Sequence, residues 1–255
     1  MRRRSGPWLR GLLSATLGSL AFHRGDLKAA RYYALQAIPA LQAVGATEDH
    51  AQVRTTLAMI ELHEGRLDEA ERVFDEMGDE SSAQSVFGGA IGLLCGRAEL
   101  LLARGEVEVG LAAYADAVNT IRDRGIPGLD LAIGYEPWVM FPQAGLVAAH
   151  ARHGRRAESE HADLLAKART QTEGDAFVDV PVLGSTLFAL AVWELRWGDR
   201  EAGAALLAYA DRFAFSRVLP SLDWEWATGL AQPAQIGPGG LDQLREPLHE
   251  LLVRL

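Results

Sequence analysis

The stretch LAMIELHEGRLDEAERVF, residues Leu57–Phe74, carries the pattern that decides the fold. Apolar residues recur at helical spacing up to Gly65, a short polar segment follows, and a second amphipathic run begins around Ala70. This pattern predicts two antiparallel helices joined by a tight turn. Because one such hairpin cannot bury its apolar face alone, the stretch also predicts neighbours of the same kind.

Alignment of the chain on the turn glycine gives five hairpins of this type, separated by 40, 40, 49 and 44 residues. We expect each turn glycine to adopt a positive φ and to end the first helix of its hairpin. Seven residues before and five residues after the glycine, every position except Val147 carries a small side chain, as close packing of paired helices requires. The fold predicted from this periodicity is all-α. The turn glycines are Gly25, Gly65, Gly105, Gly154 and Gly198, and the flanking columns are Gly18, Ala58, Ala98, Val147 and Ala191, then Ala30, Ala70, Gly110, Ser159 and Gly203.

The hairpin pattern resembles the tetratricopeptide repeat (TPR), in which small residues at the positions of Ala58 and Ala70 flank the turn glycine. The resemblance implies a right-handed TPR-like superhelix of about five hairpins, which we expect to form a single domain over residues 1–255. The units are longer than the about 34 residues of a TPR, and the excess lies between the hairpins. One such insertion covers residues 125–142, where three prolines exclude a continuous helix.

The pattern changes in residues 211–255, which we expect to cap the solenoid. The sequence predicts a short helix with Trp224 and Trp226, with Ser221 as its N-cap, and an amphipathic helix over Leu241–Leu255. An open solenoid end must cover its last apolar face, and these helices would do so.

The stretch LLAYADRFAFSRVLPSLDWEWA, residues Leu206–Ala227, resembles the C-terminal TPR region of large actinobacterial transcriptional regulators of the SARP and LuxR (MalT-like) types. The composition fits this resemblance, because only Lys28 and Lys167 among the 25 basic residues are lysine. In such proteins the TPR region is a sensor or docking arm attached to a DNA-binding domain and an ATPase module. The chain contains neither a G-x-x-x-x-G-K-[ST] loop nor a basic recognition helix. The resemblance therefore implies a non-catalytic interaction or sensor arm in transcriptional regulation.

Charge and cysteine content limit the partners and the compartment. A net charge of −9 and a pI near 5.3 argue against direct contact with nucleic acid, which needs clustered Lys and Arg. Cys95 is the single cysteine, so we expect no internal disulfide and a reducing, cytoplasmic location. The basic start of the chain is similar to a secretory signal, but Arg10 interrupts its apolar run and the segment is in register with the first hairpin. No stretch approaches the ~20 apolar residues of a membrane span, so we expect no membrane contact.

The best candidate for chemistry is a group of histidines, His150, His153 and His161, with Glu158 beside the fourth turn. These side chains are zinc ligands in other proteins, which leaves a metal-dependent enzyme as the alternative function. The group lacks the glutamate of the H-E-x-x-H pattern, and no G-x-S-x-G or cysteine nucleophile motif occurs. We therefore interpret the histidines as turn and surface residues, and expect no catalysis and no cofactor.

In the TPR family the first helix of each hairpin lines the concave face, so positions 13, 10, 9 and 6 before the turn glycine are expected to meet a partner. Here they carry small and apolar residues instead of the Lys, Arg and Asn of the family's carboxylate clamp. Such a groove fits a protein helix, a peptide or a small apolar ligand. Two alternatives stay open: the superhelix or the C-terminal helix covers this groove, or the chain is a homodimeric scaffold joined through Trp224 and Trp226. The expected groove residues are Thr16, Ser19, Thr55, Thr56, Met59, Glu99, Phe141, Phe188 and Val192.

Overall fold

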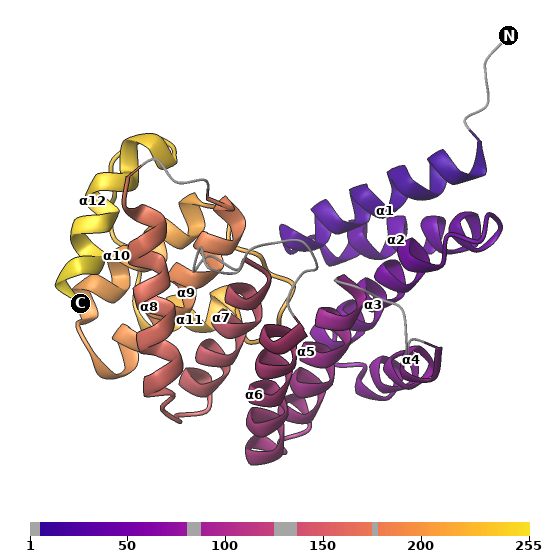
Figure 1. Ribbon diagram of the computed structural model, residues 1–255, viewed down its shortest axis with the longest axis horizontal. Helices are drawn as coiled ribbons and strands as arrows, with labels where there is room; N and C mark the ends of the chain where they lie inside the picture. The colour runs from indigo at the N-terminus through magenta and orange to yellow at the C-terminus, as the bar shows by residue number, and fades with distance from the viewer. Residues whose placement is uncertain (1–5, 81–87, 125–136, 175–177) are drawn as a thin grey trace, which may run out of the picture. The chain divides into compact units, whose positions relative to one another are not determined.

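The computed structural model describes residues 6–80, 88–124, 137–174 and 178–255, and these residues form twelve α-helices and no β-strand (Figure 1). The all-α prediction is confirmed. The helices are α1 (Pro7–His23), α2 (Leu27–Gln42), α3 (Thr47–His63), α4 (Leu67–Glu80), α5 (Gly88–Ala103), α6 (Val107–Arg124), α7 (Pro137–Arg152), α8 (Glu158–Thr172), α9 (Val180–Trp197), α10 (Arg200–Arg212), α11 (Trp224–Leu230) and α12 (Leu241–Arg254).

The contacts divide the chain into two compact units. The first comprises Met1–Tyr114 with the short segment Arg217–Pro220, and the second comprises Ala115–Ser216 with Ser221–Leu255. The repeat pattern of the sequence does not predict this division. That the hairpins continue as one right-handed superhelix over residues 1–255 stays a prediction.

Each of the five turn glycines lies between two helices, as expected. The first four turn glycines have φ between 67° and 82°, the region that a side chain disfavours. The expectation of a positive φ is wrong for Gly198, whose φ is −122°. There a Cβ would lie 1.9 Å from the carboxylate of Glu194, which accepts a hydrogen bond of 2.8 Å from the backbone N–H of Asp199. Gly198 therefore makes room for a carboxylate that holds the backbone of Asp199, the residue whose own side chain caps α10.

The two columns of small residues mark where paired helices approach one another. All of their members are buried except Ser159, which is exposed. At Gly110 and at Gly203 a Cβ would lie 3.0 Å from a backbone nitrogen, that of Leu102 and of Leu195 respectively. These two leucines each stand three residues before their turn glycine, so the same close approach recurs in two hairpins.

Replacement of Gly203 by alanine is expected to lower the free energy of unfolding by about 1 kcal/mol, because the overpacking against Leu195 exceeds the gain in helix propensity. Gly229 in α11 has no atom within 4 Å of the position of a Cβ, so Gly229→Ala is the matched control. The control is expected to leave stability unchanged or slightly higher. Urea unfolding of both variants measures the difference, and equal effects would argue against a close approach at Gly203.

Each unit is built around one helix with neighbours on several sides. In the first unit α3 contacts α1, α2, α4 and α5, and in the second unit α9 contacts α7, α8, α10 and α11. Most of α9 is buried, from Leu183 to Leu195 without interruption. This burial agrees with its sequence, which is apolar on all sides.

The C-terminal helices belong to the second unit. α11 is capped by the carboxylate of Asp223, which accepts from the Trp226 N–H at 3.0 Å, so the prediction of Ser221 as N-cap is wrong. α12 packs on α8, where the Arg169 guanidinium donates to the Leu252 carbonyl at 2.9 Å. Residues 125–136 of the expected insertion lie outside the described residues. None of the described helices combines the length and the hydropathy that crossing a membrane requires.

Candidate functional site

The residues predicted to line a concave groove differ in burial and fall into three sets. Two of the nine are exposed, two are half-buried and five are buried. The buried side chains do not form an open surface in this structure, which matches the alternative that the protein covers them itself. The buried residues are Thr55, Met59, Glu99, Phe188 and Val192.

In the first unit, glycines of α5 close the predicted groove against α3. A Cβ on Gly92 would lie 2.2 Å from the methyl carbon of Thr55, and one on Gly96 would lie 3.0 Å from the sulfur of Met59 and 2.4 Å from the ring of Phe74. Both glycines themselves occupy predicted groove positions. The residues of α3 and α5 that were expected to face a partner therefore pack against one another.

Glu99, the one charged residue expected in the groove, is a buried carboxylate that accepts a hydrogen bond from the hydroxyl of Tyr114 at 3.2 Å. Burial raises the pKa of Tyr114, and the charge of Glu99 raises it further. The pKa of the nearby Cys95 thiol is also raised, by burial and by Glu99. Both groups therefore stay protonated at neutral pH, and Cys95 has no nucleophilic thiolate.

In the second unit, the segment that follows α10 occupies the predicted groove of the fifth hairpin. The ring of Phe188 stacks on Phe215, with centroids 4.8 Å apart, and the hydroxyl of Ser185 accepts a hydrogen bond of 3.0 Å from the Ser216 N–H. A Cβ on Gly184 would lie 3.0 Å from the carbonyl oxygen of Phe213. Residues 213–216, and not the C-terminal helix, therefore cover the predicted groove positions of the fifth hairpin.

The other predicted groove residues remain accessible. Thr16 and Ser19 are exposed on α1, while Thr56 and Phe141 are half-buried. The hydroxyls of Thr16 and Thr56 donate to carbonyl oxygens one turn earlier in their own helices, at 3.0 and 3.1 Å. The contact of these four residues with a partner stays a prediction.

The histidines do not converge on a metal site in the described part of the chain, where no three His, Cys, Asp or Glu side chains are grouped to hold an ion. The ring of His161 instead stacks on Trp193, with centroids 4.5 Å apart, and its Nε2 lies 3.6 Å from a carboxylate oxygen of Glu194. Burial lowers the pKa of His153, and the charges of Arg152 and Arg155 lower it further. The alternative of a metal-dependent enzyme has no geometric support in these residues.

An aromatic and cationic cluster, which the sequence analysis missed, lies at the turns of the fourth and fifth hairpins. The guanidinium groups of Arg156 and Arg196 lie 5.5 and 5.9 Å from the ring centroid of Trp197. The ring centroid of Trp193 lies 4.7 Å from that of Trp197, with the two rings inclined by 64°. These contacts are internal to the second unit and account for Arg156 and Arg196.

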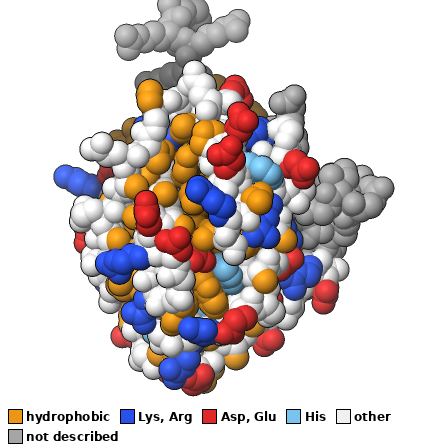
Figure 2. All heavy atoms as spheres, turned by 90° about the vertical axis from the view of Figure 1, so that its left-hand side faces the viewer, with side chains coloured by type: hydrophobic (Ala, Val, Ile, Leu, Met, Phe, Trp, Pro, Cys, Tyr) orange, Lys and Arg blue, Asp and Glu red, His pale blue; other side chains and the backbone are white. Residues whose placement is uncertain are grey.

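One face of the second unit carries a band of hydrophobic side chains between charged ones (Figure 2). On α12, the exposed Val253 lines an open hollow together with His249, Glu250 and Arg254. Trp224, expected at a homodimer contact, is half-buried and its ring lies 5.6 Å from that of Phe215. Trp226 is also half-buried. A homodimer through the two tryptophans stays a prediction.

The most apolar exposed region of the described chain is the first hairpin. The described chain has ten large, exposed hydrophobic side chains, and eight of them lie in residues 8–44. A helical-wheel analysis of α1 would have found four of them, because Leu9, Leu13, Leu17 and Leu20 fall on the side opposite Gly11, Gly18 and Phe22. The eight residues are Trp8, Leu9, Leu13, Leu17, Leu20, Tyr32, Leu35 and Val44.

Comparison with known proteins adds no family to this description. No family model, no curated protein and no solved structure matches the chain. The resemblance to the TPR therefore rests on the residues of the five hairpins, with their turn glycines and small-residue columns.

Proposed function

We propose that this protein is a non-catalytic, TPR-like interaction module that binds another protein or a peptide, as the sensor or docking arm of a transcriptional regulator. The observation that carries the proposal is the concentration of exposed apolar side chains on the first hairpin. Exposed patches of this kind mark interaction surfaces in soluble proteins. The successive helical hairpins support it too, because such arrays serve mainly as binding scaffolds.

Because five of the predicted groove residues are buried, we place the contact surface on accessible residues of the first hairpin instead. The partner would meet the side of α1 that carries Leu13 and Leu17, with the exposed Thr16 at its edge and the exposed Ser19 farther round the helix. A cytoplasmic location fits the single, buried and protonated Cys95. The link to actinobacterial regulators rests on the resemblance of residues Leu206–Ala227.

Affinity capture in the cells that encode the protein, followed by titration of the purified partner, tests the proposal. We expect a stoichiometric partner whose affinity falls at least tenfold, or about 1.4 kcal/mol, in the Leu13→Glu/Leu17→Glu variant. Val109→Glu, which changes an exposed valine on α6, is the matched control and should bind normally. The variant Thr16→Arg/Ser19→Arg shows whether the contact extends toward the predicted groove. If no partner binds the wild-type protein, the proposal fails.

A further inference from the structure

α1 has the composition of a central helix but lies at the edge of its unit. Its sequence, PWLRGLLSATLGSLAFH, contains Arg10 and His23 as its only ionisable side chains. α9 is similarly apolar, and α7, α8, α10 and α11 cover it. α1, by contrast, packs on α2 and α3 (Figure 1). Only Gly11, Gly18 and Phe22 of its residues are buried. Because a helix that is apolar on all sides is normally buried on all sides, α1 lacks a cover.

The uncovered side of α1 is a continuous row of leucines, which we call the leucine stripe: Leu9, Leu13, Leu17 and Leu20. Their spacing of four, four and three residues places them on one side of the helix, opposite the side that packs on α2. Each is between 41% and 52% exposed. The stripe itself contains no charged side chain.

We propose that the leucine stripe pairs with the leucine stripe of a second copy of this chain, across a two-fold axis that sets the two α1 helices antiparallel. The inference rests on the proposed interaction role of the first hairpin and names its partner. With the axis between Leu13 and Leu17, each Leu13 lies opposite Leu17 of the second copy, and each Leu9 lies opposite Leu20. The stripe is therefore complementary to itself, as a two-fold interface requires.

The charge on α1 selects the antiparallel arrangement. Arg10 stands five residues from the proposed axis, so the two Arg10 side chains would be about 15 Å apart along the helices, at a rise of ~1.5 Å per residue. That separation exceeds the Debye length of ~8 Å at physiological salt, and the repulsion is screened. In a parallel pair the two Arg10 side chains would face each other.

The exposed area sets the expected strength of the pairing. The leucine stripe exposes roughly 350 Å² per chain, so its pairing would bury about 700 Å² in total, the size of a weak, transient interface. We therefore expect a dimer with a dissociation constant in the high micromolar range.

A lipid surface fits less well. Helices that lie on membranes carry many Lys and Arg on the side opposite their apolar face. In α1 that side packs on α2 and contains glycine and phenylalanine, and the chain as a whole has a net charge of −9. The side of the helix that would carry cationic groups is therefore occupied by the packing on α2.

Sedimentation equilibrium of the full chain over a range of concentrations tests the proposal. We expect the apparent mass to rise from 27.6 kDa toward twice that value. In Leu13→Glu/Leu17→Glu the dissociation constant should rise about 100-fold or more, because burial of the introduced carboxylates is unfavourable. Val109→Glu and Val253→Glu change equally exposed valines elsewhere and should dimerise as the wild type does. Unchanged circular dichroism and melting temperature show that each variant is folded.

Mixing two single variants tests the arrangement of the helices. Leu13→Glu and Leu17→Lys should each dimerise poorly alone, and their equimolar mixture should recover association at least tenfold, because the new charges face each other in the antiparallel pair. A parallel pair predicts recovery from Leu13→Glu with Leu13→Lys instead, and that result would overturn the antiparallel arrangement.

Three other results would overturn the second copy as partner. The first is a wild-type protein that stays monomeric at several hundred micromolar, and the second is a dimer that survives Leu13→Glu/Leu17→Glu. The third is a monomer that binds vesicles of phosphatidylcholine and phosphatidylserine through the leucine stripe. If the protein is monomeric but a different protein is captured through α1, the dimer fails and the proposed function stands. If the protein dimerises and no other protein binds it, the dimer stands and the proposed binding of another protein fails.

Discussion

Replacement of Phe188 by alanine is expected to lower the free energy of unfolding by about 4 kcal/mol. Phe188 is fully buried in α9, and its ring stacks on that of Phe215. The truncation removes buried apolar surface and leaves a cavity, which α9 cannot close because helices hold it on several sides. Urea unfolding of the full chain should show the loss as a lower midpoint with an unchanged slope.

The same variant separates a core role of Phe188 from a role in a binding groove. Val109→Ala, at a side chain that is 57% exposed, serves as the control and should leave the midpoint unchanged. A groove residue that faced a partner would behave like Val109 in the unfolding experiment and would lose partner binding instead. Equal midpoints for Phe188→Ala and the control would therefore contradict the burial of Phe188.

The helical hairpins could be predicted from the sequence because the information that specifies them is local. A turn glycine needs a backbone conformation that other residues disfavour, and the small residues around it reflect the approach of two helices close in sequence. Gly198 shows the limit of this argument. Its position was predicted correctly, but its reason, room for the carboxylate of Glu194, depends on a side chain that the pattern does not specify.

The groove could not be predicted in the same way, because the exposure of a side chain depends on segments distant in sequence. The position of Phe188 relative to its turn glycine is the one expected for a groove residue, yet residues 213–216 return to cover it. In the first unit the covering is done by α5, whose Gly92 and Gly96 allow the backbone to approach Thr55 and Met59. The groove positions counted back from the turn glycine are taken from the TPR family. They assume that the first helices of neighbouring hairpins leave their concave side open to a partner.

The division into two units and the exposed side of α1 could not be predicted from the sequence, for one common reason. Hydrophobic periodicity reports that a helix has apolar sides, but it does not report how many neighbours the fold supplies. α1 and α9 are therefore similar as sequences and differ in the structure, since α9 is enclosed and the leucine stripe is not. The sequence places these leucines on one side of α1, and the structure shows that this side is exposed.

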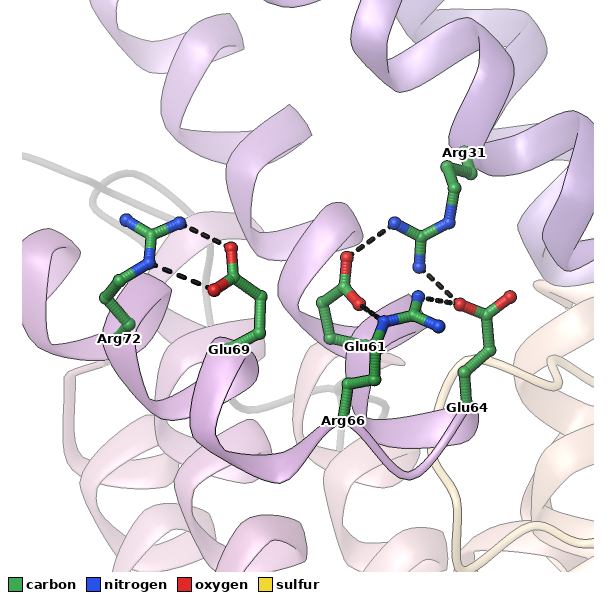
Figure 3. Close-up of polar contacts among 6 residues, drawn as sticks. All are labelled: Arg31, Glu61, Glu64, Arg66, Glu69 and Arg72. Carbon is green, nitrogen blue, oxygen red and sulfur yellow. Dashed lines mark hydrogen bonds and ion pairs between the residues drawn. The ribbon is translucent and has the colours of Figure 1, made fainter.

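Replacement of Glu61 by alanine is expected to lower the free energy of unfolding by about 2 kcal/mol. Glu61 is buried in α3, where its carboxylate accepts hydrogen bonds from Arg31 of α2, at 2.5 Å, and from Arg66 beyond the turn (Figure 3). Glu64 contacts the same two arginines. The carboxylate thus joins the first hairpin to the second and ties down the turn between α3 and α4.

The partial exposure of the arginines sets the size of this effect. The side chains of Arg31 and Arg66 are 27% and 48% exposed, so water can hydrate them in part after Glu61 is removed. The loss should therefore be smaller than the ~3–5 kcal/mol typical of breaking a fully buried pair. Glu69→Gln, which removes the charge of the exposed Arg72–Glu69 pair in the same region, is the control and is expected to have no measurable effect (Figure 3).

A double-mutant cycle between Glu61→Ala and Arg31→Ala isolates the contact between the two hairpins from the desolvation of each group. We expect a coupling of about 1 kcal/mol, because the two side chains form a direct, charge-assisted hydrogen bond. The coupling should persist in 1 M NaCl, since the carboxylate is shielded from solvent ions. A coupling near zero would mean that Glu61 acts only through Arg66 and the turn, and the two hairpins would then be held together by apolar packing such as that of Ala37 and Leu41 with Val53.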